Sequence, residues 1–191
     1  MSEPKRVVLG ISGASGAVYG VRLAEVLGSR DDVELHLVVS GGAAATIGYE
    51  TSSSLAEVES HAHTVYPEKA LGSAIASGTF QTYAMVVAPC SMRSLSAIAS
   101  SANDTLLVRA ADVHLKERRP LVLVVRETPL HRGHLRLMLD VTENGGVILP
   151  PVPGFYTRPA TVADVVDHTV GKVLDQLRLQ HDVSPPWTGL A

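Results

Sequence analysis

The sequence predicts an α/β fold in three layers, with helices on both faces of a doubly wound parallel sheet. Short, β-branched apolar runs alternate with amphipathic segments along the chain. The runs lack polar alternation, which is typical of strands buried on both faces, and their alternation with helices favours parallel pairing. At 191 residues, 46% of them hydrophobic, the chain can bury a full core. We therefore expect a Rossmann- or flavodoxin-like single domain over residues 1–191.

Each expected strand is one of the apolar runs, and each expected helix is an amphipathic segment after or between them. The strands, in order, are Val7–Ile11, Leu35–Val39, Met85–Ala88, Leu121–Val125 and Val147–Leu149. The first helices are Ala17–Leu27, Gly41–Gly48, Met92–Ala99, Asp104–Arg118 and Leu135–Glu143. In the last helix, valines and leucines recur at i, i+3 and i+4 from Val162 to Leu177, with charged residues opposite.

Two segments give a weaker pattern. Residues Thr51–Thr82 are rich in Ser, Ala and His and predict no clear element. The proline-rich tail around Ser184–Trp187 indicates a C-terminal extension from about residue 182, which we expect to pack on its own subunit or on a neighbour.

Composition excludes several classes of function. A net charge of −3 gives no electrostatic reason to bind nucleic acid or an anionic membrane. The single cysteine, Cys90, excludes an internal disulfide framework. No apolar stretch approaches the roughly 20 residues that span a bilayer, and the N-terminus lacks the apolar core of a signal peptide. We therefore expect a cytoplasmic protein.

The segment Gly10–Gly20 joins the first strand to the first helix through small residues. Backbone N–H groups at such a helix start favour phosphate, although the same residues could simply form a tight turn with a serine cap. The glycines follow G-x-x-G-x-x-G and not the dinucleotide pattern G-x-G-x-x-G. The second strand ends at Ser40 with no carboxylate at its tip in the sequence. These features favour a mononucleotide such as FMN over NAD.

Polar clusters follow four of the expected strands. They are Ser12–Ser15, Ser40, Pro89–Ser91 and Arg126–Glu127. Ligands of open α/β sheets bind outside the carboxyl ends of the strands, so we expect these clusters to meet in one crevice. The helix that begins at Ser91 offers a second site for a phosphate or a flavin edge.

Cysteine and histidine residues suggest chemistry that we rank low. Cys90 could be a thiolate nucleophile at a helix start, but no histidine lies near it in the sequence, and we expect it to be packed. His131 and His134 stand three apart, as metal ligands do, and His61 and His63 precede them, but no third ligand has recognisable spacing. We expect no metal.

Three further patterns remain open between a structural and a functional interpretation. Arg109, Asp112 and Lys116 share one helix face, either as an exposed ion-pair ladder or as two cations that face a phosphate. Arg126 could polarise a flavin ring, and Glu127 could move protons. The rigid loop Pro150–Tyr156 either connects elements, packs between subunits or forms a wall of the site.

Taken together, these segments resemble the UbiX-type flavin prenyltransferases, once described as aromatic-acid decarboxylases. The matching stretches are G-I-S-G-A-S-G-A-V-Y-G, Y-E-T, A-P-C-S, R-A-A-D-V-H-L-K-E-R-R-P-L-V-L-V-V-R-E-T-P-L and P-P-V-P-G-F-Y. The resemblance implies a metal-independent homo-oligomer, a dodecamer, that joins the dimethylallyl group of dimethylallyl monophosphate to N5 and C6 of reduced FMN. The product, prenylated FMN, would serve a partner UbiD-type decarboxylase.

The resemblance also implies a role for individual residues. Those that would hold FMN are Gly13, Ala14, Ser15, Ser40, Ser91, Met92, Arg93, Ser94 and Arg126. Those that would hold dimethylallyl phosphate are Arg109, Lys116, Glu127, Tyr156 and Lys172. Proton handling and leaving-group activation would fall to Ser15, Glu50, Glu127 and Lys116, with Glu127 as the general acid.

Two departures from the family pattern concern the prenyl donor. Lys172 stands where many relatives have arginine, and it keeps the charge but not the bidentate geometry. Some relatives cover the prenyl group with a tryptophan before the third strand, and Leu71 lies near that place here, so the donor's chain length stays open.

Three other functions compete with prenyl transfer. A flavin-dependent decarboxylase of cysteine-containing substrates would carry an asparagine-methionine motif where this chain has Cys90-Ser91-Met92-Arg93. A non-catalytic carrier of prenylated flavin would not need Lys116, Arg126 and Glu127. Direct decarboxylation of an aromatic acid belongs, by the resemblance, to the partner enzyme.

Overall fold

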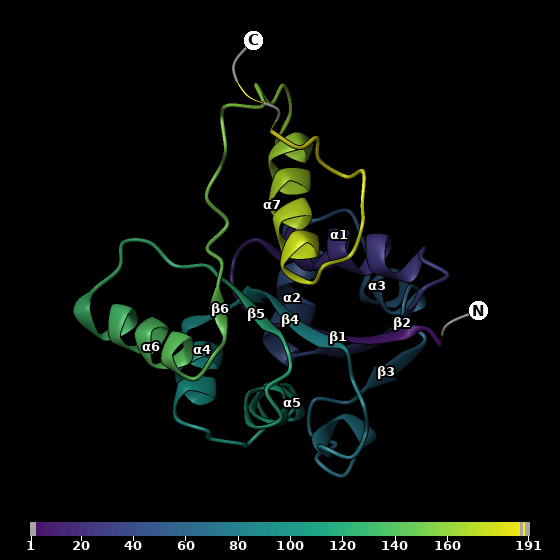
Figure 1. Ribbon diagram of the computed structural model, residues 1–191, viewed down its shortest axis with the longest axis vertical. Helices are drawn as coiled ribbons and strands as arrows, with labels where there is room; N and C mark the ends of the chain where they lie inside the picture. Colours follow the sequence, from purple (N-terminus) through teal and green to yellow (C-terminus); the bar gives the residue numbers. More distant parts are fainter. Residues whose placement is uncertain (1–2, 188, 190–191) are drawn as a thin grey trace.

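The computed structural model describes residues 3–187 and 189, and its centre is a six-stranded parallel sheet in the order β3-β2-β1-β4-β5-β6. The strands are β1 (Lys5–Ile11), β2 (Val33–Val39), β3 (Thr64–Tyr66), β4 (Ala84–Cys90), β5 (Leu121–Val125) and β6 (Val147–Ile148). The helices are α1 (Ala17–Gly28), α2 (Gly41–Glu50), α3 (Leu55–Ser60), α4 (Met92–Ala99), α5 (Leu106–Lys116), α6 (Arg132–Glu143) and α7 (Val162–Gln176). The predicted doubly wound α/β fold is confirmed (Figure 1).

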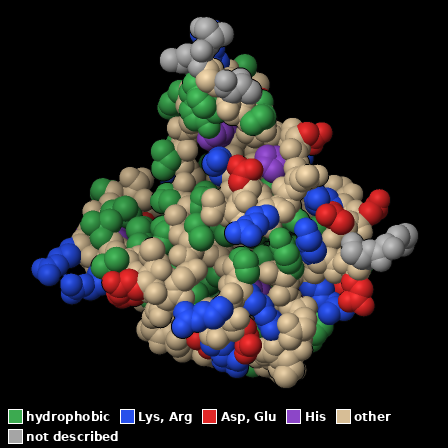
Figure 2. Space-filling model, in the orientation of Figure 1, with side chains coloured by type: hydrophobic (Ala, Val, Ile, Leu, Met, Phe, Trp, Pro, Cys, Tyr) green, Lys and Arg blue, Asp and Glu red, His purple; other side chains and the backbone are tan. Residues whose placement is uncertain are grey.

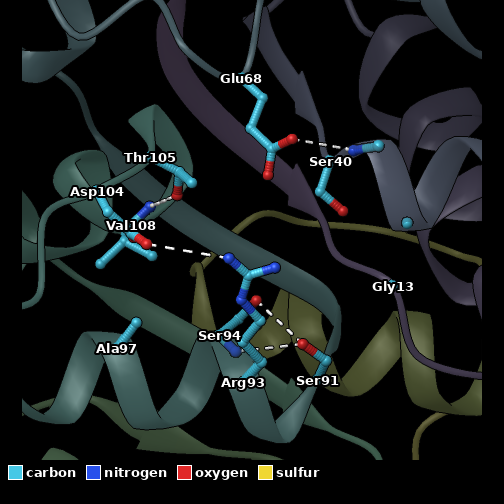
Figure 3. A pocket seen from close by; sticks show the side chains of 12 residues that line it. Gly13, Ser40, Glu68, Ser91, Arg93, Ser94, Ala97, Asp104, Thr105 and Val108 are labelled. Atoms are coloured by element: carbon cyan, nitrogen blue, oxygen red, sulfur yellow. Dashed lines mark hydrogen bonds and ion pairs between the residues drawn. The ribbon is translucent and has the colours of Figure 1, made fainter.

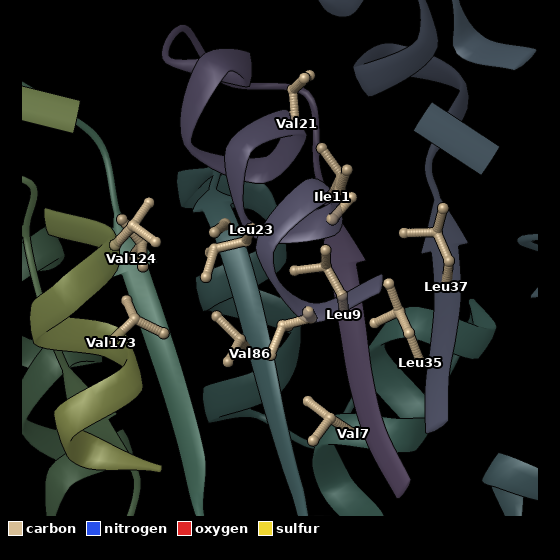
Figure 4. Close-up of a cluster of buried hydrophobic side chains, with 14 of the residues drawn as sticks. Val7, Leu9, Ile11, Val21, Leu23, Leu35, Leu37, Val86, Val124 and Val173 are labelled. Atoms are coloured by element: carbon tan, nitrogen blue, oxygen red, sulfur yellow. The ribbon is translucent and has the colours of Figure 1, made fainter. Parts of the chain in front are cut away.

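The hydrophobic core is split by the sheet into two clusters, as strands buried on both faces require. Val7, Leu9 and Ile11 of β1 point to one face, where they meet α1 and α7 (Figure 4). Val8, between them, points to the other face and packs with Met85 of β4. Alternate residues of a strand lie on opposite faces, so an unbroken apolar run supplies both halves of the core at once. Helices α4 and α5 cover the second face.

Several boundaries differ from the predicted ones because a polar side chain caps the helix. Helix α5 begins at Leu106 and not at Asp104, since Thr105 Oγ1 accepts a hydrogen bond from the Val108 N–H at 3.4 Å. Helix α6 begins three residues before the predicted Leu135, because His131 Nδ1 accepts from the Gly133 N–H at 3.0 Å. A side chain that accepts a hydrogen bond at the cap position in this way fixes where a helix starts.

The weakly patterned segment 51–82 contains elements that the sequence did not predict. Helix α3 begins with a capping box, in which the Ser54 and Glu57 side chains each bind the other's backbone. Strand β3 is three residues long and pairs with β2 at the edge of the sheet. A strand this short carries too little periodicity to be detected.

Beyond β6 the chain forms an arm, residues 149–161, that runs away from the sheet to the start of α7 (Figure 1). After α7 the tail returns along the same helix. The Tyr83 hydroxyl donates to the Leu177 carbonyl at 2.9 Å, and Arg30 Nη1 donates to the Gln180 carbonyl at 2.7 Å. The tail then brings the Trp187 ring against Tyr156 of the arm. Among the described residues, no helix is long and apolar enough to cross a bilayer.

Candidate functional site

A cavity of about 510 Å³ opens where the carboxyl ends of β1, β2 and β4 meet, the position predicted from the polar strand ends (Figure 3). Most of its lining comes from the turn after β1 and from the starts of α2, α4 and α5. The lining residues are Gly13, Ser40, Gly41, Gly42, Glu68, Ser91, Arg93, Ser94, Ala97, Asp104, Thr105 and Val108. Its size is in the range of small-molecule sites.

Gly13 allows the two loops beneath this cavity to touch. A Cβ at residue 13 would lie 3.0 Å from the backbone of Gly42, closer than ordinary van der Waals contact. A side chain there would push the start of α2 away from the turn after β1. The glycine of the motif thus shapes the floor of the cavity.

Ser12 ties the tips of β1 and β4 together below the same floor. Its side chain is buried, and its Oγ accepts from the Ser91 N–H at 2.8 Å and donates to the Pro89 carbonyl at 2.9 Å. The start of α4 is therefore fixed relative to the glycine turn.

The start of α1 is already occupied by an acidic side chain. Glu50, the last residue of α2, accepts hydrogen bonds from the Gly16 N–H at 2.7 Å and the Ala17 N–H at 3.0 Å. Partial burial raises the pKa of Glu50, but the Ser15 hydroxyl, these two N–H groups and the Arg126 guanidinium together hold it below its ordinary value. The turn that the sequence predicts as a phosphate cradle thus holds a carboxylate of the protein at α1.

The start of α2 is closed in the same way. Ser40 Oγ caps the helix by accepting from the Ala43 N–H at 3.1 Å, and Glu68 Oε2 accepts from the Gly41 N–H at 3.0 Å. No carboxylate follows β2 along the chain, as predicted, but the fold brings Glu68 from beyond β3 to the start of α2. Glu68 follows β3, a strand that the sequence does not predict, so its place at a strand end could not be recognised from the sequence.

The start of α4 carries no acidic side chain on its N–H groups. Ser91 Oγ accepts from the Ser94 N–H at 3.2 Å and donates to Ser94 Oγ at 3.1 Å. The Arg93 guanidinium extends into the cavity beside them, 3.9 Å from an Asp104 oxygen, and its side chain is 88% exposed (Figure 3). Hydroxyls, a cation and a helix N-terminus in one place suit a phosphate.

Arg126 and Glu127 lie at the rim of the crevice, directly after β5. The Arg126 N–H donates to the Cys90 carbonyl at 3.1 Å, which brings its exposed side chain next to Gly16 and Glu50. Glu127 is also exposed, and its Oε1 accepts from the Thr128 N–H at 2.9 Å. Ser15, Glu50 and Arg126 therefore form one group at this rim, with Glu127 next to it in the chain.

Cys90 is packed in the core and is not a nucleophile. Its side chain is fully buried, and burial raises the pKa of its thiol to about 12. A thiol with that pKa carries almost no thiolate at neutral pH. The low-ranked interpretation of Cys90 as a thiolate is wrong, and the packed interpretation is confirmed.

Within one chain, α5 carries two of the predicted prenyl-phosphate residues away from this crevice. The helix starts at the cavity, by the carboxyl ends of the strands, and ends near their amino ends, just before β5 begins. Arg109 donates to the Ala76 carbonyl at 3.1 Å and pairs with Asp112 at 3.0 Å. Lys116 pairs with Glu117, and both cations line a separate cavity of about 550 Å³.

Two more of the five predicted prenyl-phosphate residues, Tyr156 and Lys172, meet in a third cavity of about 520 Å³ between α7, the arm and the tail. The Tyr156 ring lies edge-on to His168, with centroids 5.5 Å apart, and edge-on to Trp187 at 5.3 Å. Lys172 pairs with Asp175 at 3.0 Å, and its side chain is half exposed. The predicted prenyl-phosphate residues thus lie at three places on one chain.

The described residues contain no group of three or more His, Cys, Asp or Glu side chains arranged to hold a metal ion. His131 and His134 lie with their rings 3.6 Å apart at the start of α6. His131 serves there as the helix cap.

The sequence matches the family described as Flavoprotein over residues 1–174. It is 54% identical over 184 residues to a flavin prenyltransferase UbiX of Thauera aromatica, covering 96% of this chain and 94% of that one.

Two solved structures are similar over almost the whole fold. One is AnUbiX (PadA1) in complex with FMN and dimethylallyl pyrophosphate, with a TM-score of 0.96, 44% identity, and coverage of 99% of this chain and 100% of that one. The other is a dodecameric FMN-dependent UbiX-like decarboxylase from Escherichia coli O157:H7, with a TM-score of 0.94, 43% identity, and coverage of 96% and 100%.

Proposed function

This chain belongs to the flavoprotein family and, within it, to the UbiX flavin prenyltransferases, and we propose that the crevice described above is where it prenylates reduced FMN. The protein is a transferase that joins a dimethylallyl group to FMN. The assignment of the crevice depends on the start of α4. There, Ser91, Ser94 and Arg93 surround N–H groups that no acidic side chain of the described residues binds.

The residues present fit FMN. A phosphate at the start of α4 would accept hydrogen bonds from the Ser91 and Ser94 region and pair with Arg93. Gly13 keeps the start of α2 close to the turn after β1 beneath the flavin site, since a Cβ there would lie 3.0 Å from the Gly42 backbone. The flavin ring would then reach the rim formed by Ser15, Glu50 and Arg126. Ala14, Ser40 and Met92 remain proposed contacts on the same path.

At the rim, different side chains of the protein would accept and donate the protons that the reaction moves. Reduced FMN, when bound, supplies the nucleophilic N5 and C6 atoms. Glu50, with its lowered pKa, is ionised at neutral pH and can accept a proton, with the Ser15 hydroxyl bound to it as a relay. Arg126 offsets negative charge beside the ring. Glu127 would protonate the departing phosphate oxygen as the general acid.

The separation of the prenyl-phosphate residues supports a site shared between subunits. Within one chain, Arg109 and Lys116 on α5 line one separate cavity, Tyr156 and Lys172 near the tail line another, and none of the four lines the cavity at the crevice. A relative of known structure is a dodecamer. We propose that this chain also forms a homo-oligomer, a dodecamer, in which neighbouring copies bring these cations to one dimethylallyl phosphate.

Exposed apolar side chains supply a surface for that assembly. They gather on α6 and along the arm (Figure 2). Phe155 of the arm is 74% exposed, and Val162 at the start of α7 is 79% exposed. Groups of exposed apolar side chains are typical of interfaces. We propose that residues 1–191 form one domain, whose extension from about residue 182 adds Trp187 to the shared site.

The decisive experiment is anaerobic incubation of the protein with reduced FMN and dimethylallyl monophosphate, followed by mass spectrometry of the released flavin. We expect the mass of FMN to increase by one dimethylallyl group. An unchanged mass with flavin bound would instead indicate a carrier. The product would serve a UbiD-type decarboxylase. Adding such an enzyme to the reaction would show whether the product supports its activity.

Mixing two inactive variants tests the shared site. Glu127→Gln and Lys172→Ala each remove one proposed member of it, and each should be inactive alone. If the two residues act on one substrate from different copies, co-assembly at equal amounts restores an intact pair at about a quarter of the sites. If both act from the same copy, the mixture stays inactive.

A further inference from the structure

Glu68 lies in the cavity assigned to the flavin phosphate, yet the reaction above gives it no task. Its carbonyl accepts a hydrogen bond from the Leu106 N–H at 2.8 Å, so the backbone is held at the start of α5. Its carboxylate reaches across to the Gly41 N–H at 3.0 Å, at the start of α2 (Figure 3). The side chain is half-buried and is fixed from both ends. Its charge is therefore presented to the cavity in one place.

The charged side chains that line this cavity are Glu68, Asp104 and Arg93. Arg93 lies 3.9 Å from Asp104, so the one guanidinium is already partly balanced by a carboxylate. Two carboxylates against one cation leave the lining with an excess of negative charge. An anion that enters is attracted at Arg93 and the start of α4 and is repelled elsewhere.

The starts of α1, α2, α4 and α5 meet at the crevice, and those of α1 and α2 hold carboxylates from the protein itself. Glu50 takes the N–H groups of α1, and Glu68 takes the Gly41 N–H of α2. At α5, the Leu106 N–H donates to the Glu68 carbonyl, so among the described residues α4 is the one start of these four at which neither Glu50 nor Glu68 takes an N–H group. The hydrogen-bond donors that remain in the cavity, at the start of α4 and on Arg93, therefore suffice for one phosphate.

We propose that Glu68 determines which flavin this site accepts, by favouring the single phosphate of FMN over the diphosphate of FAD. This inference rests on the proposed FMN site. A second phosphate brings further negative charge, and at the neighbouring start of α2 it would meet the carboxylate of Glu68 on the Gly41 N–H. Glutamine at the same position could still accept from the Gly41 N–H but would carry no charge, so the two effects of Glu68 can be separated.

The test is a titration of the full-length protein with FMN, FAD and riboflavin, followed by flavin fluorescence. We compare wild type with Glu68→Gln, and with Glu143→Gln as the control, which removes the same charge from an exposed position on α6. The preference for FMN over FAD should fall by about tenfold in Glu68→Gln, the size expected for two unit charges about 6 Å apart at an effective dielectric constant of about 40. Riboflavin affinity should be equal in all three proteins.

Two further measurements guard against a misfolded variant. Glu68→Ala should reduce the preference for FMN in the same way, because it also removes the charge. In wild type, the preference should fall as salt rises from about 0.05 M to about 0.5 M, since salt screens repulsion at this exposed cavity.

An unchanged preference in both variants, or a preference in wild type that does not respond to salt, would overturn the role of Glu68. Those results leave prenyl transfer to FMN intact, which the mass assay establishes separately. A wild-type protein that does not bind FMN would refute both the proposed site and this inference.

Discussion

Replacing Ser12 with alanine should destabilise the protein and weaken flavin binding together. The Ser12 side chain is 2% exposed, and its Oγ joins the Ser91 N–H at 2.8 Å to the Pro89 carbonyl at 2.9 Å. In Ser12→Ala the Pro89 carbonyl keeps a bond from the Ser12 N–H at 3.2 Å, but the Ser91 N–H loses its acceptor. An orphaned donor of this kind costs about 1–3 kcal/mol. We expect a loss of that size in the free energy of unfolding.

Urea unfolding at one fixed protein concentration measures this loss, because assembly makes stability depend on concentration. Ser29→Ala is the matched control, since the Ser29 hydroxyl is exposed and donates to the Val26 carbonyl at 3.1 Å. It should change stability by less than about 0.5 kcal/mol. FMN affinity should fall in Ser12→Ala alone, because Ser91 starts the helix that would hold the phosphate. Equal stability and equal FMN affinity in the two variants would refute the reasoning.

Three further predictions follow from titratable groups. Glu50→Gln keeps an oxygen for the Gly16 and Ala17 N–H groups but removes the base. The rate of prenylation, measured by mass spectrometry, should therefore fall by about 10²–10⁴-fold while FMN affinity is unchanged. A wild-type rate would contradict this role of Glu50. Burial lowers the pKa of His114 to about 4, below the unfolded value of about 6.5, so the folded state binds fewer protons and loses about 2 kcal/mol of stability as pH falls from about 7 to about 5. Urea midpoints at the two pH values should show this loss in wild type and much less of it in His114→Gln. The Cys90 thiol should resist iodoacetamide in the folded protein and react once urea exposes it, and rapid labelling of the native state would show that its burial is misassigned.

The fold could be predicted because its strongest signals are local. The run Leu121–Val125 is a strand with the predicted bounds, and Met92–Ala99 is a helix with the predicted bounds. Each carries its pattern within a few residues. Strand β3 could not be predicted, because its three residues form a strand only by pairing with β2. Helix α3 is short and depends on a cap, with one buried residue, Val58.

The site was harder to predict because it depends on distance through space. Sequence order shows that Ser12–Ser15, Ser40, Ser91 and Arg126 each follow a strand, and the parallel sheet then brings them together. Nothing in the sequence shows that Glu68 reaches Gly41 across 27 residues. Nor does helical spacing show that Lys116 lies at the far end of α5 from the cavity. Those positions follow from tertiary packing.

The contact between Trp187 and Tyr156 has a practical consequence for producing the protein. Trp187 is four residues from the end of the chain, and its ring packs on Tyr156 in the cavity that also holds Lys172. A purification tag fused after Ala191 would begin within a few residues of that cavity. Near the other end of the chain, Lys5 begins β1, and the amino ends of the strands lie opposite the crevice at their carboxyl ends (Figure 1). A group attached close after Trp187 should therefore alter donor affinity, whereas one attached before β1 should leave it unchanged.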